Sequence, residues 1–262
     1  YITGYTHASN GKQNYLTAKC DSNGNLKWMS IYNGPDNIGD ASLAIVTDSN
    51  KDVYVTGVSG FDVATIKYNT QGNIQWVSRD TNASTAVAIS VGQSGNIYVS
   101  GSGKAPNKRG FYTIAYNSDG AKLWDRTYLG PGPEWDNARD MVIDENENIF
   151  VTGSVSSING ETDIATIMYD RDGDQLWENI YDHGVFLNGT DDPSEIKVDN
   201  QGNVYVGGFS EKDTITRDGI LIKYDYQGNM LWKKTYGNTD SDDGFLSIAV
   251  DKYSNIYATG YS

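Results

Sequence analysis

The chain has 262 residues, of which 34 are acidic and 20 are Lys or Arg, so its formal net charge is −14. Proteins that bind nucleic acids neutralise phosphates with Lys and Arg, and this balance therefore argues against a nucleic-acid partner. No apolar run reaches the roughly 18 residues that a membrane span needs, and the single cysteine excludes an internal disulfide and a cysteine-rich zinc site.

The chain opens on a segment with the composition of a β-strand, "YITG", and variants of this segment return along the chain. The later copies are "VYVTG" (53–57), "IYVSG" (97–101), "IFVTG" (149–153), "VYVGG" (204–208) and "IYATG" (256–260). Their β-branched and aromatic residues favour strands. Because the chain begins inside such a strand and without Met, we expect a mature or excised segment of a longer protein.

Tryptophan marks a second recurring element. Five of the six tryptophans recur at intervals of 48, 48, 53 and 55 residues: Trp28, Trp76, Trp124, Trp177 and Trp232. A glycine stands four residues before each of them: Gly24, Gly72, Gly120, Gly173 and Gly228. Glycine adopts a positive φ at no steric cost, so each one predicts a tight turn. We expect the tryptophans to be structural and to pack between neighbouring sheets over a turn glycine.

Each repeat contains four short segments with the pattern of strands. In the second repeat they are "LAIVTD" (43–48), "VYVTG" (53–57), "ATIKYN" (64–69) and the tryptophan strand that follows. No segment has a helical period. A four-stranded antiparallel unit of about 40 to 50 residues that repeats is typical of a propeller blade. The sequence therefore predicts an all-β fold, a β-propeller of four-stranded antiparallel blades with five repeats.

The repeats predict one domain with several blades. The blades cover approximately residues 1–33, 40–81, 84–130, 137–182 and 191–237, with 242–262 supplying closing strands. Six second strands stand against five of every other type, which leaves two arrangements open. Residues 245–251 could complete the first blade and close a five-bladed ring, or the chain could be an arc of a ring of six to eight blades.

These repeats resemble a known family. The run "DNQGNVYVGG" (199–208) is similar to the SBBP-type β-propeller repeat of bacteria and archaea, as are residues 48–57 and 251–260. The run "YNTQGNIQW" (68–76) resembles the tryptophan-docking repeat of pyrroloquinoline-quinone-type propellers. The resemblance covers nearly the whole chain and implies the fold, but propellers serve as lectins, scaffolds and enzymes. An enzyme with a quinone cofactor would need a larger ring and a group of metal-binding residues. We find no such group in the sequence and therefore expect no cofactor.

One turn resembles a calcium-binding loop in its sequence. In "DRDGDQLW" (170–177), Asp170, Asp172 and Asp174 alternate around a glycine. Four other turns at the same repeat position share the first Asx and the glycine, and a hard cation needs six to eight oxygens. We therefore expect a hairpin turn, with calcium only a weak alternative.

Aspartate also recurs where each first strand begins. Fourteen residues before each second-strand aromatic stands Asp40, Ser84, Asp136, Asp191 or Asp243. On one hypothesis the carboxylates ring the mouth of the central channel and bind a cation or a polyol. On the other, each aspartate caps its loop by accepting backbone N–H bonds.

Residues outside the repeat pattern are the other candidate binding residues. They are Trp135 in "LGPGPEWDN" (129–137), and His183 and Phe186 in "DHGVFLNGTDD" (182–192). An exposed aromatic beside carboxylates can stack on a sugar or anchor a partner, but these aromatics could also fold back onto the core. The basic loop 102–110, with Lys104, Lys108 and Arg109, is expected to be a solvated tip.

Two hypotheses for function follow. The first is a non-enzymatic binding or structural module of a secreted or cell-surface protein, with the periplasm also open, that engages a protein partner or a glycan through its variable loops. It could belong to a larger multidomain chain or assembly. The alternative is a carbohydrate-active enzyme that uses channel-mouth carboxylates, with Asp136 and Asp191 as the deciding pair.

Overall fold

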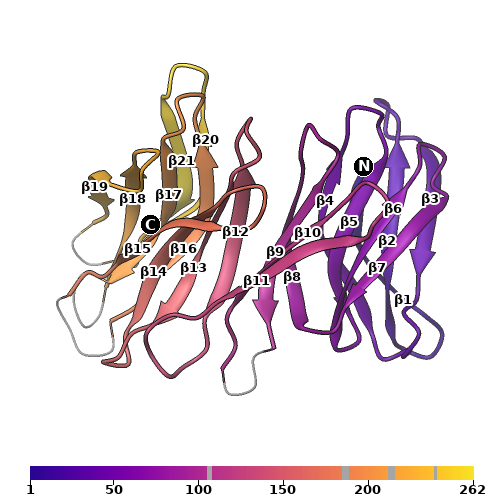
Figure 1. The fold of residues 1–262 in the computed structure, drawn as a ribbon, viewed down its shortest axis with the longest axis horizontal. Helices are drawn as coiled ribbons and strands as arrows, with labels where there is room; N and C mark the ends of the chain where they lie inside the picture. The colour runs from indigo at the N-terminus through magenta and orange to yellow at the C-terminus, as the bar shows by residue number, and fades with distance from the viewer. Residues whose placement is uncertain (105–107, 185–188, 212–215, 239–240) are drawn as a thin grey trace. The chain divides into compact units, whose positions relative to one another are not determined.

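The computed structural model describes residues 1–104, 108–184, 189–211, 216–238 and 241–262. In these ranges every long regular element is a β-strand (Figure 1). No helix within these ranges has the length and the apolar character that spanning a membrane requires.

The chain divides into two compact units. Unit 1 comprises Tyr1–Ala105 and Tyr112–Arg126, and unit 2 comprises Pro106–Phe111 and Thr127–Ser262. The division falls within two strands of the third sheet, β10 and β11, so that Phe111, Thr127 and Tyr128 are counted with unit 2.

Unit 1 is built from the first three sheets. The first sheet has three strands: β1 (Ile2–His7), β2 (Gln13–Cys20) and β3 (Leu26–Tyr32). The second has four: β4 (Asp40–Thr47), β5 (Val53–Ser59), β6 (Asp62–Tyr68) and β7 (Ile74–Asp80). The third also has four: β8 (Ala83–Val91), β9 (Ile97–Gly103), β10 (Phe111–Tyr116) and β11 (Lys122–Tyr128).

Unit 2 contains the remaining sheets. One is formed by β12 (Asn137–Ile143), β13 (Ile149–Ser156), β14 (Thr162–Tyr169) and β15 (Gln175–Tyr181). The next is formed by β16 (Asp191–Val198), β17 (Val204–Glu211), β18 (Arg217–Tyr224) and β19 (Met230–Tyr236). The last has two strands, β20 (Gly244–Val250) and β21 (Ile256–Tyr261).

Every four-stranded sheet has its strands in chain order, so each hairpin pairs with the next. The pairing is antiparallel, as where Val151 of β13 faces Ile167 of β14. The predicted four-stranded antiparallel blades are therefore confirmed. Of the predicted closing strand at 245–251, residues 245–250 lie in β20, which pairs with β21. The closed five-bladed ring and the arc of a larger one both stay predictions.

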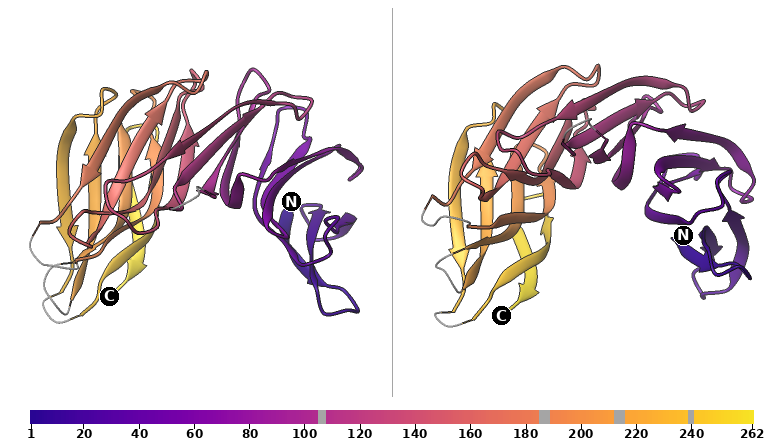
Figure 2. Two further views of the ribbon diagram at one scale, coloured as in Figure 1. Left: turned by 60° about the horizontal axis from the view of Figure 1, so that its bottom comes forward. Right: turned by 90° about the horizontal axis from the view of Figure 1, so that it is seen from below.

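The sheets within each unit pack face to face through their middle strands (Figure 2). Every residue of β13 is buried. This strand is hydrogen-bonded to β12 on one side and β14 on the other, and it packs against the next sheet of unit 2. In unit 2, Phe150 and Ile164 of one sheet pack against Val206 and Ile220 of the next. The buried middle strands give the loops at their ends a rigid base.

Repeat tryptophans join neighbouring sheets. The Trp177 indole nitrogen donates a hydrogen bond to the Tyr226 carbonyl at 3.0 Å, and the ring lies over Gly228. A Cβ at Gly228, whose φ is +85°, would come within 2.6 Å of that ring. Unit 1 has the same arrangement twice, with Trp28 over Gly72 and Trp76 over Gly120. Glycine is required there both by its φ and by the close approach of the indole.

Candidate functional site

The recurring aspartates hold the loops that precede the first strands. Asp40, Asp136, Asp191 and Asp243 are all buried. Each accepts a backbone N–H bond through Oδ2: from Gly34 at 2.8 Å, Gly130 at 2.7 Å, His183 at 3.0 Å and Asn238 at 2.8 Å, respectively. This is the geometry of loop caps, and each aspartate serves the loop that leads into its own sheet. Their roles as ligand-binding residues stay a prediction.

Asp136 has a cation beside it. The Lys108 ammonium lies 2.9 Å from Asp136 Oδ2 and also donates to the carbonyls of Gly130 at 2.8 Å and Gly132 at 2.6 Å. The Asp136 side chain is 0 % exposed, and its Oδ1 accepts the Ser156 backbone N–H at 3.0 Å. The expectation that Lys108 belongs to a solvated tip was wrong, because its ammonium neutralises a buried carboxylate. We call Lys108, Asp136 and the loop 130–132 the lysine junction.

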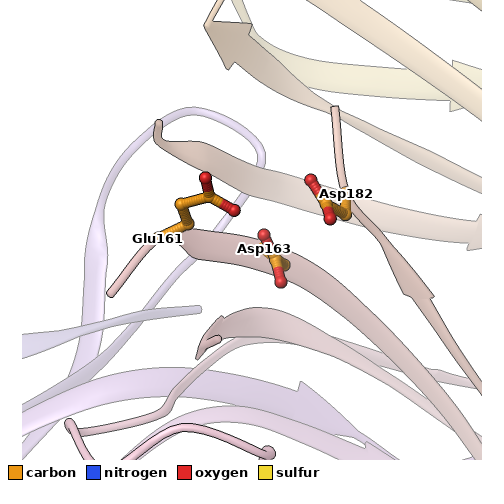
Figure 3. Close-up of side chains that lie close together, drawn as sticks. All are labelled: Glu161, Asp163 and Asp182. Atoms are coloured by element: carbon orange, nitrogen blue, oxygen red, sulfur yellow. The ribbon is translucent and has the colours of Figure 1, made fainter. Parts of the chain in front are cut away.

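The next loop cluster in unit 2 consists of acidic side chains. Glu161 and Asp163, at the start of β14, and Asp182, after β15, direct their carboxylates toward one another (Figure 3). One oxygen from each lies within 4.8 Å of the other two, a spacing that one cation can bridge. Asp191 lines the same pocket. We call Glu161, Asp163, Asp182 and Asp191 the acidic pocket.

Two carboxylates of the acidic pocket are buried. Asp163 is 4 % exposed and Asp191 is 3 % exposed. Asp191 Oδ1 has no hydrogen-bond donor, although Oδ2 accepts the His183 N–H. In the part of the chain that the structure describes, neither residue forms an ion pair with Lys or Arg. A buried charge without a counter-charge is costly.

The pKa of Asp163 reflects this surplus of negative charge. Burial, together with the charges of Asp182, Asp191 and Glu161, raises it to about 7. Burial also raises the pKa of Asp191, although the His183 backbone N–H acts to lower it. These shifts are what carboxylates show when they share a site that holds no positive charge.

The pocket is small. It is lined by the four acids, by Glu211 and by residues 183–184 and 189–190. Its interior has room for about one water molecule or ion. The Glu211 carboxylate is already bound to the Thr190 N–H at 2.6 Å. The pocket is therefore too small for a sugar.

His183 does not form a catalytic triad with Ser210 and Asp191. Its Nδ1 lies 3.0 Å from the Ser210 hydroxyl and 3.3 Å from the Tyr181 hydroxyl. Asp191, however, accepts the backbone N–H of His183, whereas a triad needs the acid to hold the imidazole. Ser210 is also buried, so a substrate could not reach its hydroxyl.

The Trp135 side chain faces solvent and does not pack onto the core. Its side chain is 63 % exposed, and the Arg109 guanidinium lies 4.5 Å from its ring centroid. The loop around it is held on both sides: the Asp136 N–H donates to the Arg109 carbonyl at 3.0 Å, and the Ser156 hydroxyl donates to the Glu134 carbonyl at 3.1 Å. The indole is thus a solvent-facing side chain on a fixed loop.

The other predicted site residues are placed as follows. Asp170 Oδ1 accepts the N–H groups of Asp172 at 2.9 Å and Asp174 at 2.8 Å, which is the geometry of a turn. That oxygen is therefore already engaged by the backbone. Phe186 lies outside the described residues.

Sequence reasoning missed Glu161, Asp163 and Asp182. A signal was present in the alignment of the repeats. Glu161 stands eight residues before Tyr169, where Lys108 stands eight before Tyr116, and Asp163 takes the place of Gly110. A reversal of charge at one repeat position, beside a recurring aspartate, would have indicated this pocket.

No family model and no curated protein matches the chain. Solved structures do. Virginiamycin B lyase from Staphylococcus aureus matches with a TM-score of 0.52 at 11 % identity, over 97 % of this chain and 82 % of that one. The chain has a β-propeller fold. The resemblance to the SBBP-type repeat stays a prediction.

Two further solved structures are similar. Drosophila Semaphorin 1b, extracellular domains 1–2, matches with a TM-score of 0.53 at 7 % identity over 90 % of this chain. The chain spans 56 % of that protein's length. A Bacteroides caccae protein of unknown function matches with a TM-score of 0.50 at 12 % identity, over 88 % of this chain and 80 % of that one. At these identities the likeness shows the fold alone.

Proposed function

We propose that the chain is a non-enzymatic propeller module that binds a partner through the loops of unit 2 around Trp135. One observation carries this proposal: Trp135 is 63 % exposed on a loop that both flanks hold in place. A large aromatic that faces solvent at a fixed position costs little entropy to bind, and Trp and Arg are enriched among binding hot spots.

A protein partner is favoured over a glycan. Leu129 is also exposed, and so is Ile158, on the turn that follows the Ser156 contact. Gly132 of the tryptophan loop packs against the backbone of Ser157, which joins the two loops. Apolar side chains around an aromatic–arginine pair are typical of protein interfaces, whereas a sugar site needs a set of directed hydrogen-bonding groups. An extracellular or cell-surface location belongs to this proposal.

The test compares the purified chain with its Trp135→Ala variant. Both are applied to a glycan array and to pull-down from surface-protein extracts. We expect the substitution to remove binding, while Tyr253→Ala, which truncates an exposed aromatic on the turn between β20 and β21, leaves it unchanged. Array binding that depends on Trp135 would change the ligand class to glycan. A partner retained by Trp135→Ala would contradict the proposal.

The carbohydrate-active alternative makes a different prediction. Replacing Asp136 and Asp191 by Asn would abolish turnover if they were catalytic. The full burial of Asp136 and its pairing with Lys108 argue against contact with a substrate. For a binding module, turnover of arrayed glycans is absent in the unmodified chain as well.

A further inference from the structure

The acidic pocket and the lysine junction are built on equivalent residues of successive repeats. Asp191 corresponds to Asp136, fourteen residues before the second-strand aromatic. Glu161 corresponds to Lys108, eight residues before the third-strand tyrosine. The two structures therefore hold a buried carboxylate at the same place, but only one has a positive charge within reach.

In the lysine junction the Lys108 ammonium contacts three oxygens. They are Asp136 Oδ2 and the carbonyls of Gly130 and Gly132, at 2.6 to 2.9 Å. In the acidic pocket the corresponding loop contributes Asp182 and His183 to the lining. The oxygen-rich environment is kept, and the ammonium is replaced by the additional carboxylates of Glu161 and Asp163.

We propose that the acidic pocket binds one hard divalent cation, Ca²⁺ in preference to Mg²⁺, which occupies the place that the Lys108 ammonium takes in the lysine junction. Asp191 supplies an observation that is independent of the three clustered acids. Its side chain is 97 % buried by area and lines the pocket, and its Oδ1 has no donor. An acceptor without a donor in such a place is suited to a metal ligand.

The donor set and the space define the class of ion. Four carboxylates offer up to eight oxygens, the ligands that Ca²⁺ and Mg²⁺ prefer. One oxygen from each of Glu161, Asp163 and Asp182 lies within 4.8 Å of the other two, a distance that a Ca²⁺ ion with Ca–O bonds of about 2.4 Å can span. Mg²⁺ usually keeps several bound waters, and this pocket has no room for them. The pocket admits about one water-sized body. His183 Nδ1 is engaged by Tyr181 and Ser210, which argues against a zinc site built on that nitrogen.

The charges around the equivalent aspartate of unit 1 support this proposal. Asp62 stands at the repeat position of Asp163 but has Arg79 at 3.0 Å and Lys104 at 2.9 Å. Burial would raise the pKa of Asp62, yet hydrogen bonds from Lys104 and Arg79 hold it below the usual value. The same position is neutralised by two side chains in unit 1, and in unit 2 a bound cation has that role.

The test is calorimetric titration of the full chain, after removal of metals with a chelator, with CaCl₂ and separately with MgCl₂. We expect one saturable site that is tighter for Ca²⁺, and a higher melting temperature with Ca²⁺ than with chelator.

Two variants test which residues bind the ion. Glu161→Lys should weaken Ca²⁺ binding at least tenfold and raise the melting temperature in chelator, because the new ammonium can reach Asp191 as Lys108 reaches Asp136. Asp163→Asn, which keeps the shape, should also weaken binding at least tenfold.

Asp172→Asn, which removes an exposed carboxylate from the turn at the opposite end of the β14–β15 hairpin, is the matched control and should bind Ca²⁺ as the unmodified chain does. Absence of saturable heat up to about 10 mM, beyond the roughly 1 mM constants of weak extracellular calcium modules, would overturn the proposal. Equal binding by Asp163→Asn would do so too, whether or not Glu161→Lys folds. None of these outcomes depends on Trp135, so this site and the proposed partner surface fail or stand separately.

Discussion

Asp136 and Asp191 occupy the same repeat position and cap their loops in the same way, but their surroundings carry opposite charge. Lys108 neutralises Asp136 at 2.9 Å, whereas Asp191 shares its pocket with Glu161, Asp163 and Asp182. The sheets are alike at both places, and the difference lies in a few loop residues. A propeller keeps a carboxylate in position through its strands and leaves its counter-charge to the loops.

The largest expected effect is the loss of the cation in the lysine junction. Lys108→Ala leaves the Asp136 carboxylate buried and unpaired, which should lower the free energy of unfolding by about 3 to 5 kcal/mol. Urea denaturation measures the change. Lys104→Ala removes a more exposed partner of Asp62 and should cost no more than about 1 kcal/mol. Equal losses in both variants would show that burial does not distinguish the two pairs.

Asp199 shows what hydrogen bonds do for a carboxylate without any cation. Burial raises its pKa, but donors from Asn203, Tyr205 and Ser254 outweigh burial and lower it to about 2. The lowered pKa stabilises the fold above about pH 4, the unfolded value, and this contribution disappears as the pH falls toward 2. Asp199→Asn should cost about 1.5 to 3 kcal/mol at pH 7. A difference from the unmodified chain that stays constant between pH 5 and pH 2 would contradict this assignment.

Asp163→Asn should act in the opposite direction. In chelator the amide removes one of four crowded negative charges while keeping the shape, so the free energy of unfolding should rise by about 1 to 2 kcal/mol at neutral pH. Chemical denaturation with and without Ca²⁺ measures this, and the gain should vanish when the unmodified chain is saturated with Ca²⁺. Asp62→Asn, at the equivalent position beside Arg79 and Lys104, should lower stability instead.

The smallest effect on stability is expected at Trp135. Because its side chain is largely exposed, Trp135→Ala should change the free energy of unfolding by no more than about 0.5 kcal/mol. Trp177→Ala should cost several times more, since that indole packs over Gly228 and donates to the Tyr226 carbonyl. Thermal melts of the two variants side by side decide this, and similar losses would mean that Trp135 has a structural role.

The strands could be predicted because their signals are local and repeated. The segments at 53–57, 97–101, 149–153 and 204–208 became buried middle strands, and the turn glycines such as Gly228 have the positive φ that the turns require. The site was harder to predict. Asp136 and Asp191 look identical in the repeat pattern, and nothing within a few residues of either one reveals its counter-charge.

By itself the sequence determined the fold class, the repeat and the likeness of the four loop aspartates, because β-periodicity and turn chemistry are properties of short segments. Only the tertiary structure decided which charges meet. Lys108 reaches Asp136 across 28 positions, and Glu161 comes near Asp191 across 30. Such contacts form when neighbouring sheets pack and bring loops from different hairpins together, and the cost of a buried charge then depends on what the packing has placed beside it.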